Sequence, residues 1–255
     1  MPTRDTPFPA GTPSWVDLFS SDTARAAEFY GAVLGWTFEP GPPEFGGYGN
    51  FTSDGHQVAG MMHNSGEAGT PDTWTVYVTV DDAEATAAVA EKAGATVVAP
   101  AMAVGDLGSM AVLVDPAGAA FGLWQPGRHI GYTKHDEPGS PSWEELLTRD
   151  FASATSFYRE VFGWQLEPVS DTDDFRYFTA KVGDTEVAGL MDGGRLPADQ
   201  APSHWAVYFR VDDVDAAVVE VERLGGTVVE APQDTPYGRL ATVADPTGAA
   251  FKLHG

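Results

Sequence analysis

Most of this chain consists of two similar copies of one sequence. Residues 14–40 (SWVDLFSSDTARAAEFYGAVLGWTFEP) return as residues 142–168 (SWEELLTRDFASATSFYREVFGWQLEP), and 13 of the 27 aligned positions are identical. A repeat period of 128 residues is too long for a solenoid unit, which rarely exceeds about 50 residues. A chain of 255 residues is long enough to bury two cores of ordinary domain size. We therefore expect two homologous domains.

The first half opens with signals for a strand and a capped helix. Residues 15–19 are typical of a short strand, Asp22 is a suitable N-cap for the next helix, and Gly35 is placed to end it. The order that follows is β-α-β-β-β. Further strands, separated by glycine and proline clusters, are predicted at residues 36–39, 49–53 and 57–63.

The same order then repeats within the first half. A strand at residues 74–80 precedes a helix that ends at Gly94, and strands follow at residues 96–99, 110–114 and 120–124. The second half repeats both modules, so the predicted fold class is α+β with four βαβββ modules. On the second helix, one face is predicted to carry Ala85, Ala88, Val89 and Ala93.

The two halves are joined by a segment without hydrophobic periodicity. We place the first domain at residues 1–126, a linker at 127–141 and the second domain at 142–255, because the middle segment concentrates proline, glycine and charge. His129 and His135 lie in this linker, where we expect them to be solvated or locally hydrogen-bonded.

Composition excludes several kinds of chemistry. The chain has 14 Lys and Arg against 37 Asp and Glu, and its net charge of −23 disfavours nucleic acid and anionic membranes as partners. The absence of cysteine excludes disulfides, thiolate nucleophiles and cysteine-bearing metal sites. Residues 1–12 contain no apolar run typical of a signal peptide or a membrane span, so we expect a cytoplasmic protein.

Three motifs occur in both halves. They are the Asp-capped helix that ends in Phe-Tyr-x-x-Val-(Leu/Phe)-Gly-Trp, the Val-Asp-Asp start of the next helix, and the Asp-Pro-x-Gly-x-x-Phe turn at residues 115–121 and 245–251. The chain resembles the vicinal oxygen chelate superfamily of glyoxalase I, bleomycin-resistance proteins and extradiol dioxygenases. It is most similar to tandem two-domain, glyoxalase-like actinobacterial proteins. The resemblance implies two domains in which a mixed sheet forms a cup around a small molecule.

Catalytic members of this superfamily hold a divalent metal in the cup with His, Gln or Glu. The resemblance places the corresponding positions on Trp15, Thr75, Gly122 and either Gly60 or Met61. None is a usual metal ligand, since the indole N–H can only donate a hydrogen bond. We therefore expect neither a metal nor another cofactor. The equivalent positions of the second domain are Trp143, Ala206, Lys252 and either Gly189 or Leu190.

Strand alternation predicts which side chains share the cup faces with these positions. An aromatic wall with a few polar anchors suits a small molecule, aromatic or cationic, although Trp15 and Trp143 could instead fill the cups as structural plugs. The predicted ligand-binding residues are Trp15, Phe19, Tyr77, Trp124, Trp143, His204, Tyr208, Arg210, Lys252 and His254. The alternate residues Val76, Val78, Val80, Val207, Phe209 and Val211 are predicted to be core.

Each predicted cup contains one carboxylate, Asp17 or Glu145. A carboxylate beside indole could have a raised pKa and act as a general base, or it could be held in a structural ion pair, such as Glu145 with Lys252. His204 and His254 could be structural, or could form a metal triad with Glu145 that the family does not use.

The loops near the two cups differ. Residues 41–50 (GPPEFGGYGN) lack the Lys-Ser/Thr ending of a phosphate-binding loop and are predicted to form a flexible rim. The counterpart at residues 169–176 is acidic, so the cups either admit different ligands or only one of them is functional.

Three functions remain open from the sequence. The first is metal-free binding of a small molecule by a glyoxalase/bleomycin-resistance-like protein. The second is an enzyme of the same superfamily, hydroxylase-, isomerase- or lyase-like, with or without a metal. The third is a non-catalytic interaction scaffold. Because two fused domains could replace the dimer of single-domain relatives, we expect a monomer.

Overall fold

Each half of the chain forms one mixed, eight-stranded sheet. The computed structural model describes residues 3–42, 46–66, 69–195 and 202–255. In the first sheet the strand order is β2-β3-β4-β1-β5-β8-β7-β6. The strands are β1 (Pro13–Ser20), β2 (Thr37–Glu39), β3 (Gly49–Ser53), β4 (His56–His63), β5 (Thr73–Thr79), β6 (Thr96–Val104), β7 (Gly108–Val114) and β8 (Ala120–Pro126), with helices α1 (Thr23–Leu34) and α2 (Ala83–Lys92).

The second sheet repeats this topology in the order β10-β11-β12-β9-β13-β16-β15-β14. The predicted α+β fold of four βαβββ modules in two glyoxalase-like domains is therefore confirmed. Its elements are β9 (Ser140–Thr148), α3 (Phe151–Phe162), β10 (Gln165–Asp171), β11 (Arg176–Val182), β12 (Thr185–Asp192), the short 3-10 helix η2 (Gly193–Arg195), β13 (His204–Arg210), α4 (Val214–Arg223), β14 (Thr227–Thr235), β15 (Gly238–Ala244) and β16 (Ala250–His254).

Local sequence fixes the ends of the helices. The Asp22 side chain accepts a hydrogen bond from the Arg25 amide at 3.0 Å, and Gly35 ends α1 in the left-handed conformation with φ 71°. Asp150 and Gly163 cap α3 in the same way. In α2 the predicted apolar face is wrong, because Val89 is exposed and the buried residues are Ala83, Ala87 and Ala90.

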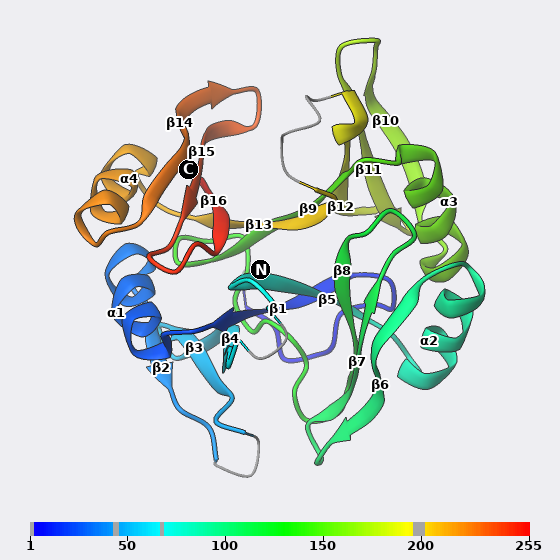
Figure 1. Cartoon of the computed structure of the whole chain (residues 1–255), viewed down its shortest axis with the longest axis horizontal. Helices are drawn as coiled ribbons and strands as arrows, with labels where there is room; N and C mark the ends of the chain where they lie inside the picture. The colour runs from blue at the N-terminus through cyan, green and yellow to red at the C-terminus, as the bar shows by residue number, and fades with distance from the viewer. Residues whose placement is uncertain (1–2, 43–45, 67–68, 196–201) are drawn as a thin grey trace.

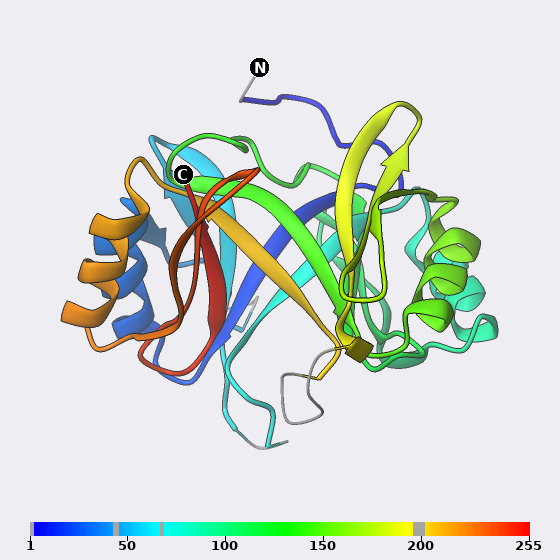
Figure 2. The same ribbon diagram turned by 90° about the horizontal axis from the view of Figure 1, so that it is seen from above.

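The two sheets pack back to back, with α1 beside α4 at one side and α2 beside α3 at the other (Figure 1). The ring of Trp74 in β5 lies 5.0 Å from that of Phe209 in β13, so these faces form a shared core. The six predicted core residues Val76, Val78, Val80, Val207, Phe209 and Val211 are all buried. The opposite faces of the sheets point away from this core and are the predicted cup faces. Figure 2 shows the curvature of the strands from above.

Buried hydrogen bonds join the first helix of each domain to the last turn of the other domain. The Tyr30 hydroxyl in α1 donates to Asp245 at 3.1 Å, and it accepts from Trp74 Nε1 at 3.1 Å. Tyr158 in α3 makes the equivalent bond to Asp115 at 3.0 Å. Two of the repeated motifs, Phe-Tyr and Asp-Pro-x-Gly, therefore meet across the domain interface.

The segment between the sheets is anchored rather than running freely over the surface, as its composition had suggested. The side chains of Tyr132 and Lys134 are buried, and Lys134 Nζ contacts Ser53 Oγ and Asp54 Oδ2, each at 2.9 Å. The Tyr132 hydroxyl donates to Glu144 at 2.8 Å. Glu144 lies on the inter-sheet face of β9, where burial raises its pKa to about 7.

Candidate functional site

The first cup is centred on neighbouring strands β1 and β5. Trp15 pairs with Tyr77 and Asp17 with Thr75, so these four side chains lie on the outward face of the sheet. Phe19 follows on the same face of β1. Trp124 in β8 lies farther along this face, since Tyr77 is in register with Gly122. The predicted residues of the first cup are thus on one face.

A tyrosine that the sequence did not single out, Tyr48, completes the floor. Its hydroxyl accepts from Trp15 Nε1 at 2.8 Å. The ring lies over Gly60 so closely that a Cβ at that position would be 1.8 Å from the Tyr48 hydroxyl. Tyr48 lies in the segment predicted as a flexible rim, of which residues 43–45 fall outside the described residues.

Asp17 is the acidic group of this floor. Its carboxylate accepts a hydrogen bond from Tyr77, but no lysine or arginine contacts it among the residues that the structure describes. Burial in this aromatic environment raises its pKa to about 7, and the hydrogen bond from Tyr77 only partly offsets that effect. A raised carboxyl pKa is compatible with the general-base role considered from sequence.

His129 closes one end of the first cup. Its ring is 4.3 Å from the ring of Trp15 and 5.3 Å from that of Trp124, both in edge-to-face geometry. Nδ1 accepts from the Gly131 amide at 3.2 Å, which is the local hydrogen bond expected as one of the two alternatives for this residue. Burial lowers the pKa of His129 to about 4, which keeps the ring neutral. His135 is half-buried beside the ring of Phe8.

The second cup repeats the aromatic floor. Trp143 Nε1 donates to the Tyr177 hydroxyl at 3.0 Å, and a Cβ at Gly189 would be 2.0 Å from that hydroxyl. Tyr177 is the repeat counterpart of Tyr48, because each precedes by two residues the strand position paired with the cup glycine. The repeat thus carried a signal for both tyrosines.

The carboxylate of the second cup has different neighbours. Lys252 Nζ lies 3.0 Å from Glu145 Oε1 and 2.8 Å from the Tyr208 hydroxyl. The ion pair considered from sequence between Glu145 and Lys252 is therefore present. The first domain has Gly122 where Lys252 stands, and there the Tyr77 ring fills the space.

Three other predicted residues lie at the ends of the second cup. His204 Nδ1 is 2.8 Å from the Pro202 carbonyl, and His254 Nε2 is 2.9 Å from the Tyr237 carbonyl. Arg210 is paired with Asp136 at 2.9 Å. His254 is in register with Arg210, six residues along β13 from His204, or roughly 20 Å. The alternative metal triad of His204, His254 and Glu145 is therefore not assembled.

The family metal positions do not provide a donor set in either cup. The Trp15 N–H is committed to Tyr48, and tyrosine rings occupy the space above Gly60 and Gly122. In the second cup an ammonium group, that of Lys252, replaces a ligand. Within the four described ranges, no three His, Cys, Asp or Glu side chains are grouped as metal ligands.

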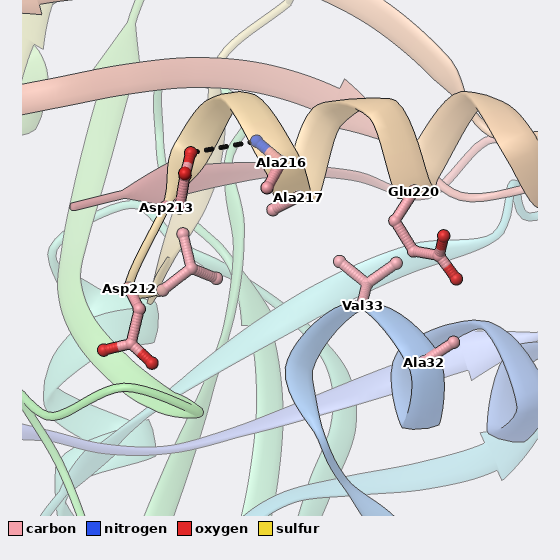
Figure 3. Close-up of a pocket in the computed structure, with 8 residues that line it drawn as sticks. Ala32, Val33, Asp212, Asp213, Ala216, Ala217 and Glu220 are labelled. Carbon is pink, nitrogen blue, oxygen red and sulfur yellow. Dashed lines mark hydrogen bonds between the residues drawn. The ribbon is translucent and has the colours of Figure 1, made fainter.

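Two surface depressions lie away from the cups, at the helix pairs. One of about 280 Å³ lies between α1 and α4 (Figure 3), and one of about 220 Å³ lies at the equivalent place between α2 and α3. Small apolar side chains and carboxylates line the first, and its Asp213 is occupied in capping α4 through the Ala216 amide.

Comparison with known families agrees with the two-cup architecture. A family model described as the Glyoxalase/Bleomycin resistance protein/Dioxygenase superfamily matches residues 141–253, and one described as a Glyoxalase-like domain matches residues 15–124. The chain belongs to this glyoxalase superfamily. In this glyoxalase superfamily member, the matched residues include Trp15, Asp17 and Tyr77 of the first cup and Trp143, Glu145 and Lys252 of the second.

Full-length relatives share the tandem arrangement. CFP32 of Mycobacterium bovis, provisionally named a glyoxylase, is 39% identical over 258 residues, which cover 99% of this chain and 97% of the relative. The anthracycline biosynthesis protein DnrV of Streptomyces peucetius is 40% identical over 267 residues, covering 97% and 94% of the two chains.

Solved structures of this superfamily share the fold at much lower sequence identity. The Mn(II)-bound glyoxalase from Novosphingobium aromaticivorans aligns with TM-score 0.66 and 16% identity, covering 96% of this chain and 81% of that one. The 2,2',3-trihydroxybiphenyl 1,2-dioxygenase of Sphingomonas wittichii aligns with TM-score 0.63 and 15% identity, covering 96% and 90%. No helix in the described residues is long and apolar enough to cross a membrane.

Proposed function

We propose that this protein binds an aromatic small molecule in its first cup and does so without a metal ion. The observation that carries the proposal is the pair of unequal carboxyl groups. Glu145 is paired with Lys252, whereas Asp17 lies among aromatic rings with no cation beside it. Keeping a partly buried carboxyl group among aromatic rings without a counter-ion costs stability, which is typical of a binding or catalytic position.

The surroundings of Asp17 suit a flat ligand. Trp15, Tyr77 and Trp124 lie on the same face as Asp17 and are nearly buried. A planar molecule that displaced the side chains covering them would gain both apolar burial and ring stacking. The relative DnrV is named for anthracycline biosynthesis, and anthracyclines are polycyclic aromatic compounds. Both points support an aromatic ligand over an aliphatic one.

The test is calorimetric titration of the protein with a panel of neutral and cationic aromatic compounds. We expect one molecule to bind per chain. At a ligand concentration 100 times Kd, binding should raise the free energy of unfolding by about 2.7 kcal/mol. Trp15→Phe should weaken binding at least tenfold. The matched variant Trp143→Phe removes the same N–H from the second cup and should leave affinity unchanged. A panel without any binder, or equal losses in both variants, would contradict the proposal.

A second candidate is a metal-independent isomerase in which Asp17 acts as general base. The pKa of about 7 favours it, because a base with a pKa near the working pH transfers protons efficiently. In D₂O, such an enzyme would exchange the α-proton of an enolisable aromatic ketone for deuterium. Asp17→Asn should abolish that exchange. Retained exchange in the variant would exclude Asp17 as the base.

A further inference from the structure

A tyrosine and a carboxylate lie side by side at equivalent places in the two cups. The Tyr208 hydroxyl donates a hydrogen bond to Glu145 in the second cup, and the Tyr77 hydroxyl donates one to Asp17 in the first. The second cup adds an ammonium group to this pair. Lys252 Nζ lies 3.0 Å from Glu145 Oε1, 2.8 Å from the Tyr208 hydroxyl and 4.8 Å from the centre of the Tyr208 ring. The second cup is therefore an internal example of how this tyrosine and carboxylate receive an ammonium group.

The first cup cannot supply that ammonium group from its own chain. Gly122 is the residue at the position of Lys252, since the two are in register with equivalent tyrosines. A Cβ at Gly122 would be 2.0 Å from the ring of Tyr77, so no side chain fits there. Among the described residues, no lysine or arginine is paired with Asp17. A cation beside Asp17 must therefore come from another molecule.

A row of oxygen acceptors crosses the sheet through Asp17. Asn50, Gly60 and Asp17 are in register on β3, β4 and β1. Asn50 Oδ1 is buried and has no hydrogen-bond partner among the described residues. Glu39, at the end of β2, pairs with Asn50 and is exposed. This row carries two carboxylates and an unpartnered amide oxygen without a positive charge, so it favours a cationic hydrogen-bond donor over an anion.

The accessible part of this face lies beyond Asp17 along β1. Trp15 is buried, whereas Asp17 and Phe19 are both partly exposed. Phe19 is in register with Met62, which is 39% exposed. Two residues of a strand span about 6.6 Å, a distance that a two-carbon chain bridges between an ammonium group and the centre of an aromatic ring. A ligand with its ammonium group at Asp17 would thus place its ring over Phe19 and Met62.

We propose that the first cup binds a primary arylalkylamine, whose ammonium group takes beside Asp17 the place that Lys252 Nζ takes in the second cup. This inference rests on the proposed function and names the ligand class for the same site. The Asp17 carboxylate accepts a charge-assisted hydrogen bond, and Asn50 adds a further acceptor on the same row. The ring packs on Phe19 and on the thioether of Met62, which contacts aromatic surfaces favourably. The net charge of −23 attracts cations to the protein and repels anions.

The experiment is calorimetric titration with 2-phenylethylamine at pH 8, above the pKa of about 7 for Asp17. 2-Phenylethanol has the same ring and length without a charge, 3-phenylpropionate has the opposite charge, and n-butylamine lacks the ring. We expect one amine molecule per chain. It should bind at least tenfold more tightly than each of the other three compounds, since a charge-assisted hydrogen bond or a ring contact is worth about 1–1.4 units of log affinity. Added NaCl should weaken amine binding and leave binding of the alcohol unchanged.

Two variants test the two ends of the ligand. Asp17→Asn keeps the size of the side chain and removes its charge, so the amine should lose its advantage over the alcohol. Phe19→Ala should weaken amine binding roughly threefold or more. The matched variant Leu147→Ala changes the equivalent position of the second cup and should leave amine affinity as in the wild type.

Three results would overturn this inference and leave the proposed function intact. They are binding of the alcohol or the carboxylate as tight as that of the amine, an unchanged preference for the amine in Asp17→Asn, and equal losses in Phe19→Ala and Leu147→Ala. Failure of every aromatic compound to bind would overturn both. The comparison of the four compounds uses the wild-type protein and so does not depend on the folding of a variant.

Discussion

Asp17 and Glu145 occupy the same place on equivalent strands but have different neighbours. Glu145 is paired with Lys252, and the corresponding first-cup position is Gly122, which has no side chain to offer. The difference between Gly122 and Lys252 therefore decides whether a cation lies beside the carboxylate.

Two carboxyl groups with raised pKa values, Asp17 and Glu144, should govern how stability changes with pH. Burial raises the pKa of Asp17 and of Glu144 to about 7, whereas both groups release their protons near pH 4 in the unfolded chain. The folded state therefore binds more protons between pH 4 and 7, and the free energy of unfolding falls as pH rises through that window. Asp17→Asn and Glu144→Gln should each remove part of this fall, on the order of 3 kcal/mol per site.

Urea unfolding at pH 5 and pH 8 measures that difference. Glu91→Gln, which replaces an exposed carboxylate of α2, serves as the control and should leave the difference between the two pH values unchanged. If neither buried-site variant reduced the difference, the two groups would not be holding protons in the folded state.

At the scale of helices and strands, the local sequence was sufficient to predict helix ends, where a cap requires a particular type of residue. Asp22 and Gly35 defined α1 because a side-chain cap and a left-handed C-terminal residue have few substitutes. The face of α2 was mispredicted because its sequence is rich in alanine, whose small side chain marks no face clearly. Ala83, Ala87 and Ala90 lie against the sheet, and Val89 remains exposed.

Strand alternation correctly predicted which strand side chains lie on the cup faces. It did not predict the side chains from other segments that cover those faces. The two-residue period placed Trp15, Asp17 and Tyr77 together, as the register of β1 and β5 confirms. Tyr48 and His129 were missed because they reach the cup from irregular segments, whose side-chain directions follow no period. Tyr48 is placed by its hydrogen bond with Trp15, and His129 by its ring contacts with Trp15 and Trp124.

For the whole molecule, the two domains should unfold together. Tyr30→Phe removes a hydroxyl that donates to Asp245 and accepts from Trp74, leaving two buried groups unpaired at a cost of about 1–3 kcal/mol. Because that bond joins α1 to the second domain, scanning calorimetry should show one transition at lower temperature in the variant. Tyr237→Phe, at a hydroxyl that is exposed in the native chain, should leave the transition in place.

The outcome that would contradict a shared core is two separate transitions in the wild-type protein.

We also propose that the molecule is a monomer, since the inner face of each sheet is covered by the other sheet. Sedimentation should then give a mass of 27.0 kDa. A tight dimer would mean that an outward face, rather than the inter-sheet face, carries a further interface.

The sequence by itself determined the duplication, the α+β modules, the capped helices and the alternation of cup and core residues. These depend on local periodicity and on residues with restricted backbone or capping roles, so they can be recognised without knowing distant contacts. The tertiary structure decided that Lys252 reaches Glu145 while Asp17 has only Tyr77, and that Tyr48 and His129 cover the first cup. Charge pairing and burial arise only when distant segments meet, and they make the two copies of one sequence chemically different.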